Sequence, residues 1–134
     1  MRIFMRHPAD IPIEVSPDGK QATAYSIGSG GLAFRTLREF EPGTLVNVRI
    51  PYVSPAFDTE ARVVWCRPGN GGFELGIEFL SSDDAFKARM VEQLCHIENY
   101  RQAVKRNEGR DLSTEEAAAE WIRAYAAIFP RTDA

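Results

Sequence analysis

The sequence predicts a mainly β fold, a six-stranded antiparallel β-barrel followed by a C-terminal extension of two helices. Three observations lead to this prediction. Up to residue 81, short runs rich in β-branched and aromatic residues are separated by turns that contain Gly, Pro and Asp. Six such runs at regular spacing are typical of a small barrel. After residue 81, apolar residues recur at the spacing of a helix instead.

The strands are predicted from alternating apolar residues and from the turns between them. Ile11–Val15 alternates as a half-buried strand does, and Ser16-Pro17-Asp18-Gly19 is a strong turn signal. The strongest β run is Thr59–Cys66, and it is followed by a turn rich in Gly at residues 68–72. The six expected strands cover residues 11–15, 21–27, 32–36, 45–50, 59–66 and 73–80.

Two helices are predicted from caps and from apolar stripes. Ser82-Asp83-Asp84 is a helix start with acids at the positive end of the dipole, and Gly109 ends that helix. Ser113 and Glu116 form a capping box that opens the second helix, which Pro130 closes. We expect the apolar stripes to cover the open end of the barrel, or else to pair two copies in a homo-oligomer. The stripe of the first helix comprises Phe86, Met90, Leu94, Ile97 and Val104, and that of the second Ala118, Trp121, Ile122, Tyr125 and Phe129.

Length and composition fit one small domain. The 134 residues are 44% hydrophobic, which suffices for one core. We expect residues 1–81 to form the barrel with its N-terminal arm and residues 82–134 to form the helical extension. The net charge of −3 disfavours duplex DNA or RNA as a partner, because proteins that bind duplexes are usually basic.

The sequence also predicts a cytoplasmic location. No apolar run reaches the length of a membrane span, so we expect no membrane insertion, and residues 1–6 lack the apolar stretch of a signal peptide. Cys66 and Cys95 stand in unlike contexts and do not suggest a disulfide framework. A reducing compartment is the simplest interpretation.

No catalytic or metal site is expected. The histidines are His7 and His96, and the sequence contains neither a Gly-x-Ser-x-Gly elbow nor a phosphate-binding loop with lysine. Cys95 and His96, with Glu92 or Glu98 on the same helix, could be imagined as metal ligands. We expect instead that Cys95 packs in the interior and that His96 is solvated, with no metal and no cofactor.

Two segments before residue 32 have the chemistry of a ligand site. Arg2 and Arg6 are four residues apart, so their guanidinium groups point to one side and can bind phosphate or the Hoogsteen edge of guanine together. The alternative is a basic chain terminus without a ligand. In Ser26–Gly31, three glycines let the backbone approach a ligand closely and hold an anion, or else they form a flexible hairpin.

Together these segments resemble the PilZ family, whose signature is Arg-x-x-x-Arg followed by [Asp/Asn]-x-Ser-x-x-Gly. Residues 2–6 fit the first motif, and residues 26–31 stand where the second belongs. Residues 61–65 and 75–79 also resemble later strands of the family, so the resemblance covers residues 2–81. It implies a non-catalytic six-stranded barrel that binds cyclic di-GMP and passes occupancy to an effector protein, which the sequence does not identify. It also implies that the arginines grip guanine and phosphate above a floor made by the second motif.

The second motif departs from the family pattern. When Gly31 is aligned with its final glycine, Ser26 stands at the Asp/Asn position and Gly28 at the Ser position. Losing one or two hydrogen bonds would weaken binding by roughly 10- to 100-fold, although the adjacent Ser29 can compensate. The alternative is a degenerate adaptor that works through protein contacts without nucleotide. The predicted ligand-binding residues are Arg2, Arg6, Ser26, Gly28, Ser29, Gly30 and Gly31.

Overall fold

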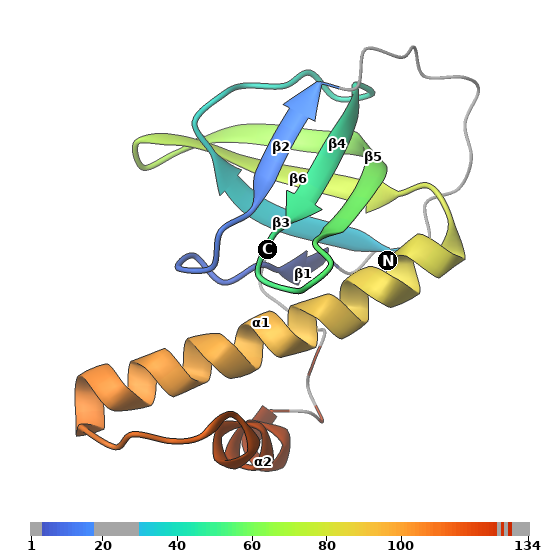
Figure 1. Cartoon of the computed structure of the whole chain (residues 1–134). Helices are drawn as coiled ribbons and strands as arrows, with labels where there is room; N and C mark the ends of the chain where they lie inside the picture. The colour runs from blue at the N-terminus through green and yellow to red at the C-terminus, as the bar shows by residue number, and fades with distance from the viewer. Residues whose placement is uncertain (1–3, 18–29, 126, 128, 130–134) are drawn as a thin grey trace.

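The computed structural model describes residues 4–17, 30–125, 127 and 129, which form one six-stranded sheet and two helices (Figure 1). The helices are long α1 (Ser82–Glu108) and shorter α2 (Thr114–Tyr125). The strands are β1 (Phe4–Arg6), β2 (Glu14–Pro17), β3 (Gly31–Thr36), β4 (Leu45–Ile50), β5 (Phe57–Gly69) and β6 (Gly72–Phe79).

The sheet is mixed and is not closed into a barrel. Its strand order is β1-β3-β6-β5-β4-β2, so β1 and β2 form the two edges. Strand β1 runs parallel to β3, whereas the other neighbouring strands are antiparallel. The predicted closed antiparallel barrel is therefore wrong in closure and in orientation. The reason is β1, a three-residue strand too short to show alternation, which adds a parallel edge through pairing with a distant segment.

The four later predicted strands are confirmed to within a few residues, as β3 to β6. The predicted strand at 11–15 overlaps β2 only at Glu14 and Val15. The predicted strand at 21–27 lies outside the described residues.

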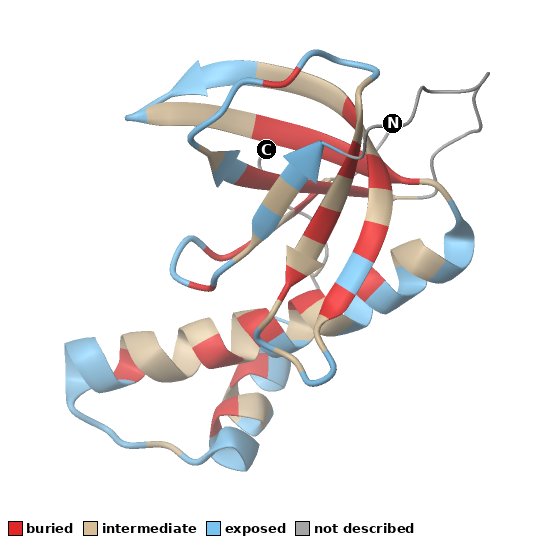
Figure 2. Ribbon diagram, turned by 45° about the horizontal axis from the view of Figure 1, so that its top comes forward, coloured by how far each residue is buried: buried red, intermediate tan, exposed pale blue. Residues whose placement is uncertain are grey.

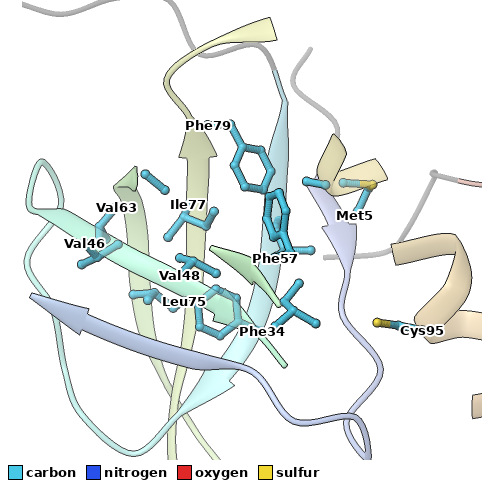
Figure 3. Close-up of a cluster of buried hydrophobic side chains, with 14 of the residues drawn as sticks. Met5, Phe34, Val46, Val48, Phe57, Val63, Leu75, Ile77, Phe79 and Cys95 are labelled. Atoms are coloured by element: carbon cyan, nitrogen blue, oxygen red, sulfur yellow. The ribbon is translucent and has the colours of Figure 1, made fainter. Parts of the chain in front are cut away.

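The core lies on one face of the curved sheet. Leu75, Ile77 and Phe79 alternate along β6 and are fully buried, as expected for a strand with one face toward a core. Each such side chain contributes about 1.5–3 kcal/mol through burial. Met5 from β1 and Cys95 from α1 extend the same cluster beyond the central strands (Figure 3).

Helix α1 begins and ends close to the predicted residues. The Ser81 hydroxyl accepts a hydrogen bond from the backbone N–H of Asp84 at 3.1 Å, which caps the first turn. Gly109 has a φ of 70°, and its N–H donates to the carbonyl of Lys105, so the helix ends in a left-handed cap. In the described part of the chain, neither helix is both long and apolar enough to cross a membrane.

The predicted apolar stripe of α1 is buried only in part. Phe86, Met90 and Leu94 are 66%, 51% and 48% exposed, whereas Val104 is buried. Phe86 and Met90 line a groove together with Phe57. Figure 2 shows buried and exposed stretches alternating along α1. Toward the start of α1, the buried side carries the small residues Ala88 and Cys95, with Glu92 between them. Small side chains let the helix lie close to the strands, and a pattern based on large apolar residues therefore identifies only part of the buried face.

Helix α2 packs on α1 and begins with the predicted capping box. The Ser113 hydroxyl accepts from the backbone N–H of Glu116, and the Glu116 carboxylate accepts from the N–H of Ser113. Trp121 is buried, but Ile122 and Tyr125 are exposed, so the predicted apolar face is buried only in part. Pro130 lies outside the described residues.

Candidate ligand-binding site

Strand pairing places the arginine arm beside the end of the glycine segment. In the parallel β1–β3 pair, Phe4 stands opposite Gly31 and Arg6 opposite Ala33. Of the predicted site residues, the structure therefore brings Arg6 and Gly31 into adjacent strands, with Gly30 next to them. The other four predicted residues, Arg2, Ser26, Gly28 and Ser29, lie outside the described residues.

Gly31 is required by packing in this position. A β-carbon on Gly31 would lie 2.4 Å from the ring of Phe4, far inside van der Waals contact, and its φ is not in the left-handed region. A β-carbon on Gly30 would meet Ala85 at 3.3 Å, a much milder contact. The sequence predicted that these glycines let the backbone approach a ligand; at Gly31 the space is filled by the arm itself.

Arg6 projects to the opposite side of the sheet from the buried Met5, because successive strand residues alternate. There its guanidinium binds Glu74 of β6 through its two terminal nitrogen atoms: Nη1 lies 2.9 Å from Oε1, and Nη2 is in direct contact with Oε2. Arg67 of β5 approaches the same carboxylate, with Nη2 3.6 Å from Oε1. The hydrogen bond from Arg6 holds the pKa of Glu74 below its ordinary value.

Aromatic rings lie beside these charged groups on the same side of the sheet, which we call the outer face. Trp65 lies over Gly76, where a β-carbon would come 2.2 Å from the indole. The guanidinium of Arg67 lies 4.7 Å from the centre of the Trp65 ring, and the Phe4 ring meets that indole edge-on at 5.6 Å. We call this set the outer-face cluster. It consists of Phe4, Arg6, Trp65, Arg67 and Glu74.

The outer-face cluster has the chemistry for a nucleotide. Its two guanidinium groups, 32% exposed in Arg6 and 53% in Arg67, suit phosphate oxygens or a guanine edge. Its aromatic rings are surfaces on which a base can stack.

Sequence analysis did not identify Trp65, Arg67 or Glu74 as site residues. A signal existed for the first two, because residues two apart in a strand share a face. The hairpin register that sets Arg67 opposite Glu74 also depends on the nearby turn at residues 69–72. The contact of Glu74 with Arg6 spans 68 residues and has no local signature.

The other side of the arm is tied to α1. His7 is 4% exposed; its Nδ1 lies 2.6 Å from Oε2 of Glu92, and its Nε2 donates to the carbonyl of Ile11 at 2.7 Å. The Nε2 of His96 donates to the carbonyl of Arg6 at 2.7 Å. The arm is therefore fixed by strand pairing and by two helix contacts from Phe4 onward, and not a loose basic terminus.

His96 is not solvated, contrary to the prediction. Burial lowers its pKa below the ordinary value. Its ring stacks on Trp121 at 6.2 Å and meets Phe129 edge-on at 5.4 Å, so one histidine joins the arm to α2. Cys95 packs in the interior, as predicted, and burial together with the charge of Glu92 raises the pKa of its thiol to about 12.

Comparison with known proteins adds an independent finding. The model of the PilZ domain family matches residues 2–95, well over half of the chain. The searches of curated proteins and of solved structures found no match to the chain. The matched range contains the arginine arm, all of the outer-face cluster and the first half of α1. The chain therefore belongs to the PilZ domain family.

Proposed function

We propose that this chain is a non-catalytic receptor that binds cyclic di-GMP at the outer-face cluster and passes occupancy to an effector protein. The observation that carries the proposal is the position of Arg6, the second arginine of the family motif, in a strand paired directly with the strand that starts at Gly31. The second arginine of the first motif and the final glycine of the second motif thus lie in paired strands at one sheet edge. Arg2, Ser26, Gly28 and Ser29 complete the proposed ligand set on the evidence of sequence.

Glu74 defines what the ligand has to replace. A carboxylate that accepts from the two terminal nitrogen atoms of a guanidinium offers the same pair of acceptors as a phosphate, or as O6 and N7 of guanine. Arg6 is thus held by an internal substitute for the ligand. Cyclic di-GMP would take the guanidinium from Glu74, so binding changes the contacts of β1 with β6.

A route from this site to the helices exists in the contacts of Arg6 and His96. The carbonyl of Arg6 accepts from His96, and the ring of His96 packs on Trp121 and Phe129. A ligand that moves Arg6 would alter the hydrogen bond between its carbonyl and His96 of α1. Because His96 packs on Trp121, this change would also alter how α2 packs on α1. The effector would then recognise the helical surface, which carries the exposed Phe86, Met90 and Leu94.

Nuclear magnetic resonance titration with cyclic di-GMP tests the location of the site. We expect the largest amide shifts at residues 2–8 and 26–36 and at Trp65 and Glu74, with smaller shifts near His96. Shifts confined to the C-terminal helices would contradict this placement. Arg106→Ala is a matched control for Arg6→Ala, because Arg106 is exposed in the last turn of α1, at the far end of the helix from Ala85, which packs beside Gly30.

An adaptor that works without nucleotide is the second candidate. It is favoured by the exposed stripe Phe86, Met90 and Leu94, which suits a protein partner or a second copy of the chain. The altered Ser26 and Gly28 favour it as well. The double substitution Ser26→Asn, Gly28→Ser distinguishes the receptor from the adaptor. A weakened receptor should gain about 1–3 kcal/mol in cyclic di-GMP binding, whereas an adaptor should gain none.

Sedimentation of the parent and of Met90→Glu shows whether the exposed stripe on α1 joins two copies of the chain.

We place the protein in the cytoplasm. Cys66 and Cys95 are both free thiols in the described structure, and a reducing compartment keeps thiols in that state. Cyclic di-GMP, as a second messenger, would be met there.

A further inference from the structure

We propose that His7, Glu92, Cys95 and His96 form a binding site for Zn²⁺ or a similar divalent transition-metal ion. We call these four residues the inner cluster. Sequence analysis rejected a metal site because it considered only residues of the helix. The fold adds His7, which lies 85 residues from Glu92 in the chain and comes from the opposite side of the site.

The separations of the donor atoms fit one ion. The ring nitrogen of His7, a carboxylate oxygen of Glu92 and the sulfur of Cys95 all lie within 4.8 Å of one another. Nε2 of His96 lies 3.8 Å from Oε1 of Glu92. In tetrahedral zinc sites, bonds of about 2.0–2.3 Å place neighbouring donor atoms roughly 3.3–3.8 Å apart. The His7–Glu92 distance of 2.6 Å would have to open, and His96 would have to leave the carbonyl of Arg6.

A second observation, independent of the donor-atom distances, concerns the carboxylate of Glu92. Its side chain is fully buried, and Oε1 has no hydrogen-bond partner among the described residues. A buried carboxylate oxygen without a donor is costly, and such atoms are rare in folded proteins. Because Oε1 faces His96 and belongs to the same carboxylate that contacts His7, a cation among these groups would satisfy it.

The net charge of the inner cluster is the same with and without a divalent ion. One hydrogen is shared between His7 and Glu92, and the thiol of Cys95 carries another. A divalent ion that displaces both leaves the net charge of the inner cluster unchanged, so binding adds no uncompensated charge to the interior. The mixture of nitrogen, oxygen and sulfur donors suits zinc-like ions, whereas Mg²⁺ and Ca²⁺ prefer oxygen alone.

A pocket provides access to the inner cluster. It has a volume of about 190 Å³ and is lined by Arg6, His7 and His96, among others. An ion entering there would meet both histidines before the buried carboxylate and thiol. Once bound, it would fasten the arm that carries Arg6 to α1 through His7, in place of the hydrogen bond from His96 to the carbonyl of Arg6.

Cobalt titration of the full chain, purified without a polyhistidine tag and stripped of metal, tests this proposal. We expect one Co²⁺ per chain, a thiolate-to-cobalt charge-transfer absorption, the visible bands of a tetrahedral ion, and displacement by Zn²⁺. Cys95→Ser should abolish the charge-transfer absorption, and Glu92→Gln should weaken binding at least 10- to 100-fold, roughly the loss seen when even outer partners of metal ligands are removed. Cys66→Ser, at the other thiol, should change neither.

The parent protein decides the matter even if a variant fails to fold. A folded parent that shows no thiolate-to-cobalt absorption at a several-fold excess of Co²⁺ would overturn the proposal. A charge-transfer absorption that disappears in Cys66→Ser and persists in Cys95→Ser would overturn it too, because the metal would then bind elsewhere.

Discussion

Arg6 and Glu74, 68 residues apart in the chain, form a two-pronged ion pair on the outer face of the sheet. The arginine that we propose as a ligand contact is therefore also bound by a carboxylate of the protein itself. Glu74 both orients this guanidinium and competes for it, and the first prediction concerns which of these effects is larger.

Glu74→Gln should tighten the binding of cyclic di-GMP. The substitution removes the negative charge that holds Arg6, and a partly exposed ion pair of this kind is worth up to about 1 kcal/mol, or roughly 5-fold in affinity. Calorimetric titration of parent and variant measures the change. Glu39→Gln, which removes the same charge from an exposed loop, is the control. Weaker binding in Glu74→Gln alone would mean that Glu74 serves mainly to orient Arg6.

The same pair predicts how stability depends on acid. Because Arg6 lowers the pKa of Glu74 from its ordinary value of 4.5, the carboxylate contributes stability that is fully present above that value and is lost as the pH falls through the lower folded-state pKa. The difference in unfolding free energy between parent and Glu74→Gln should thus stay constant from neutral pH down to about 5 and shrink below it. Urea unfolding across this range measures it. A difference that shrinks between pH 8 and 6 would point to another group.

Gly31→Ala should detach the arm. The added β-carbon would stand 2.4 Å from the ring of Phe4, and such overpacking typically costs about 1–3 kcal/mol. Gly30→Ala, which meets only Ala85 at 3.3 Å, should cost less. Adding Phe4→Ala to Gly31→Ala should restore part of the loss, because it removes the clashing ring. Thermal unfolding of the four proteins checks this order, and equal losses in the two glycine variants would contradict it.

The local parts of this fold could be predicted from sequence. The helix caps at Gly109 and Ser113 and the strands β3 to β6 follow from residues close together in the chain, and the structure has them near the expected positions. What sequence missed depends on distant contacts. Strand β1 exists because β3 offers it a parallel edge, and the packing side of α1 follows from where the arm lies.

The candidate site shows the same division. The motif at residues 2–6 pointed to Arg6, but its partner Glu74 could not be found without the register of the β5–β6 hairpin and the placement of β1. Likewise, His7 looked like part of a basic terminus, because nothing near it in the chain reveals that Glu92 meets it in the interior.

The two sides of α1 should respond differently to substitution, because one side is exposed and the other is buried. Leu94→Ser should cost less than about 1 kcal/mol, since Leu94 is 48% exposed and surface changes are mild. Ala88→Leu, on the fully buried side, should cost about 1–3 kcal/mol through overpacking. Chemical unfolding of the two variants compares the faces. The reverse order of losses would restore the stripe that the sequence predicted as the buried face.

Calorimetric titration of the purified chain with cyclic di-GMP, beside Arg6→Ala and the charge-matched Arg106→Ala, tests the central claim most directly. We expect the parent and Arg106→Ala to bind alike. Arg6→Ala should lose most of the affinity, because it removes a bidentate donor and leaves Glu74 to repel the phosphates. Binding in Arg6→Ala equal to that of the parent, or no binding by a well-folded parent, would contradict the account.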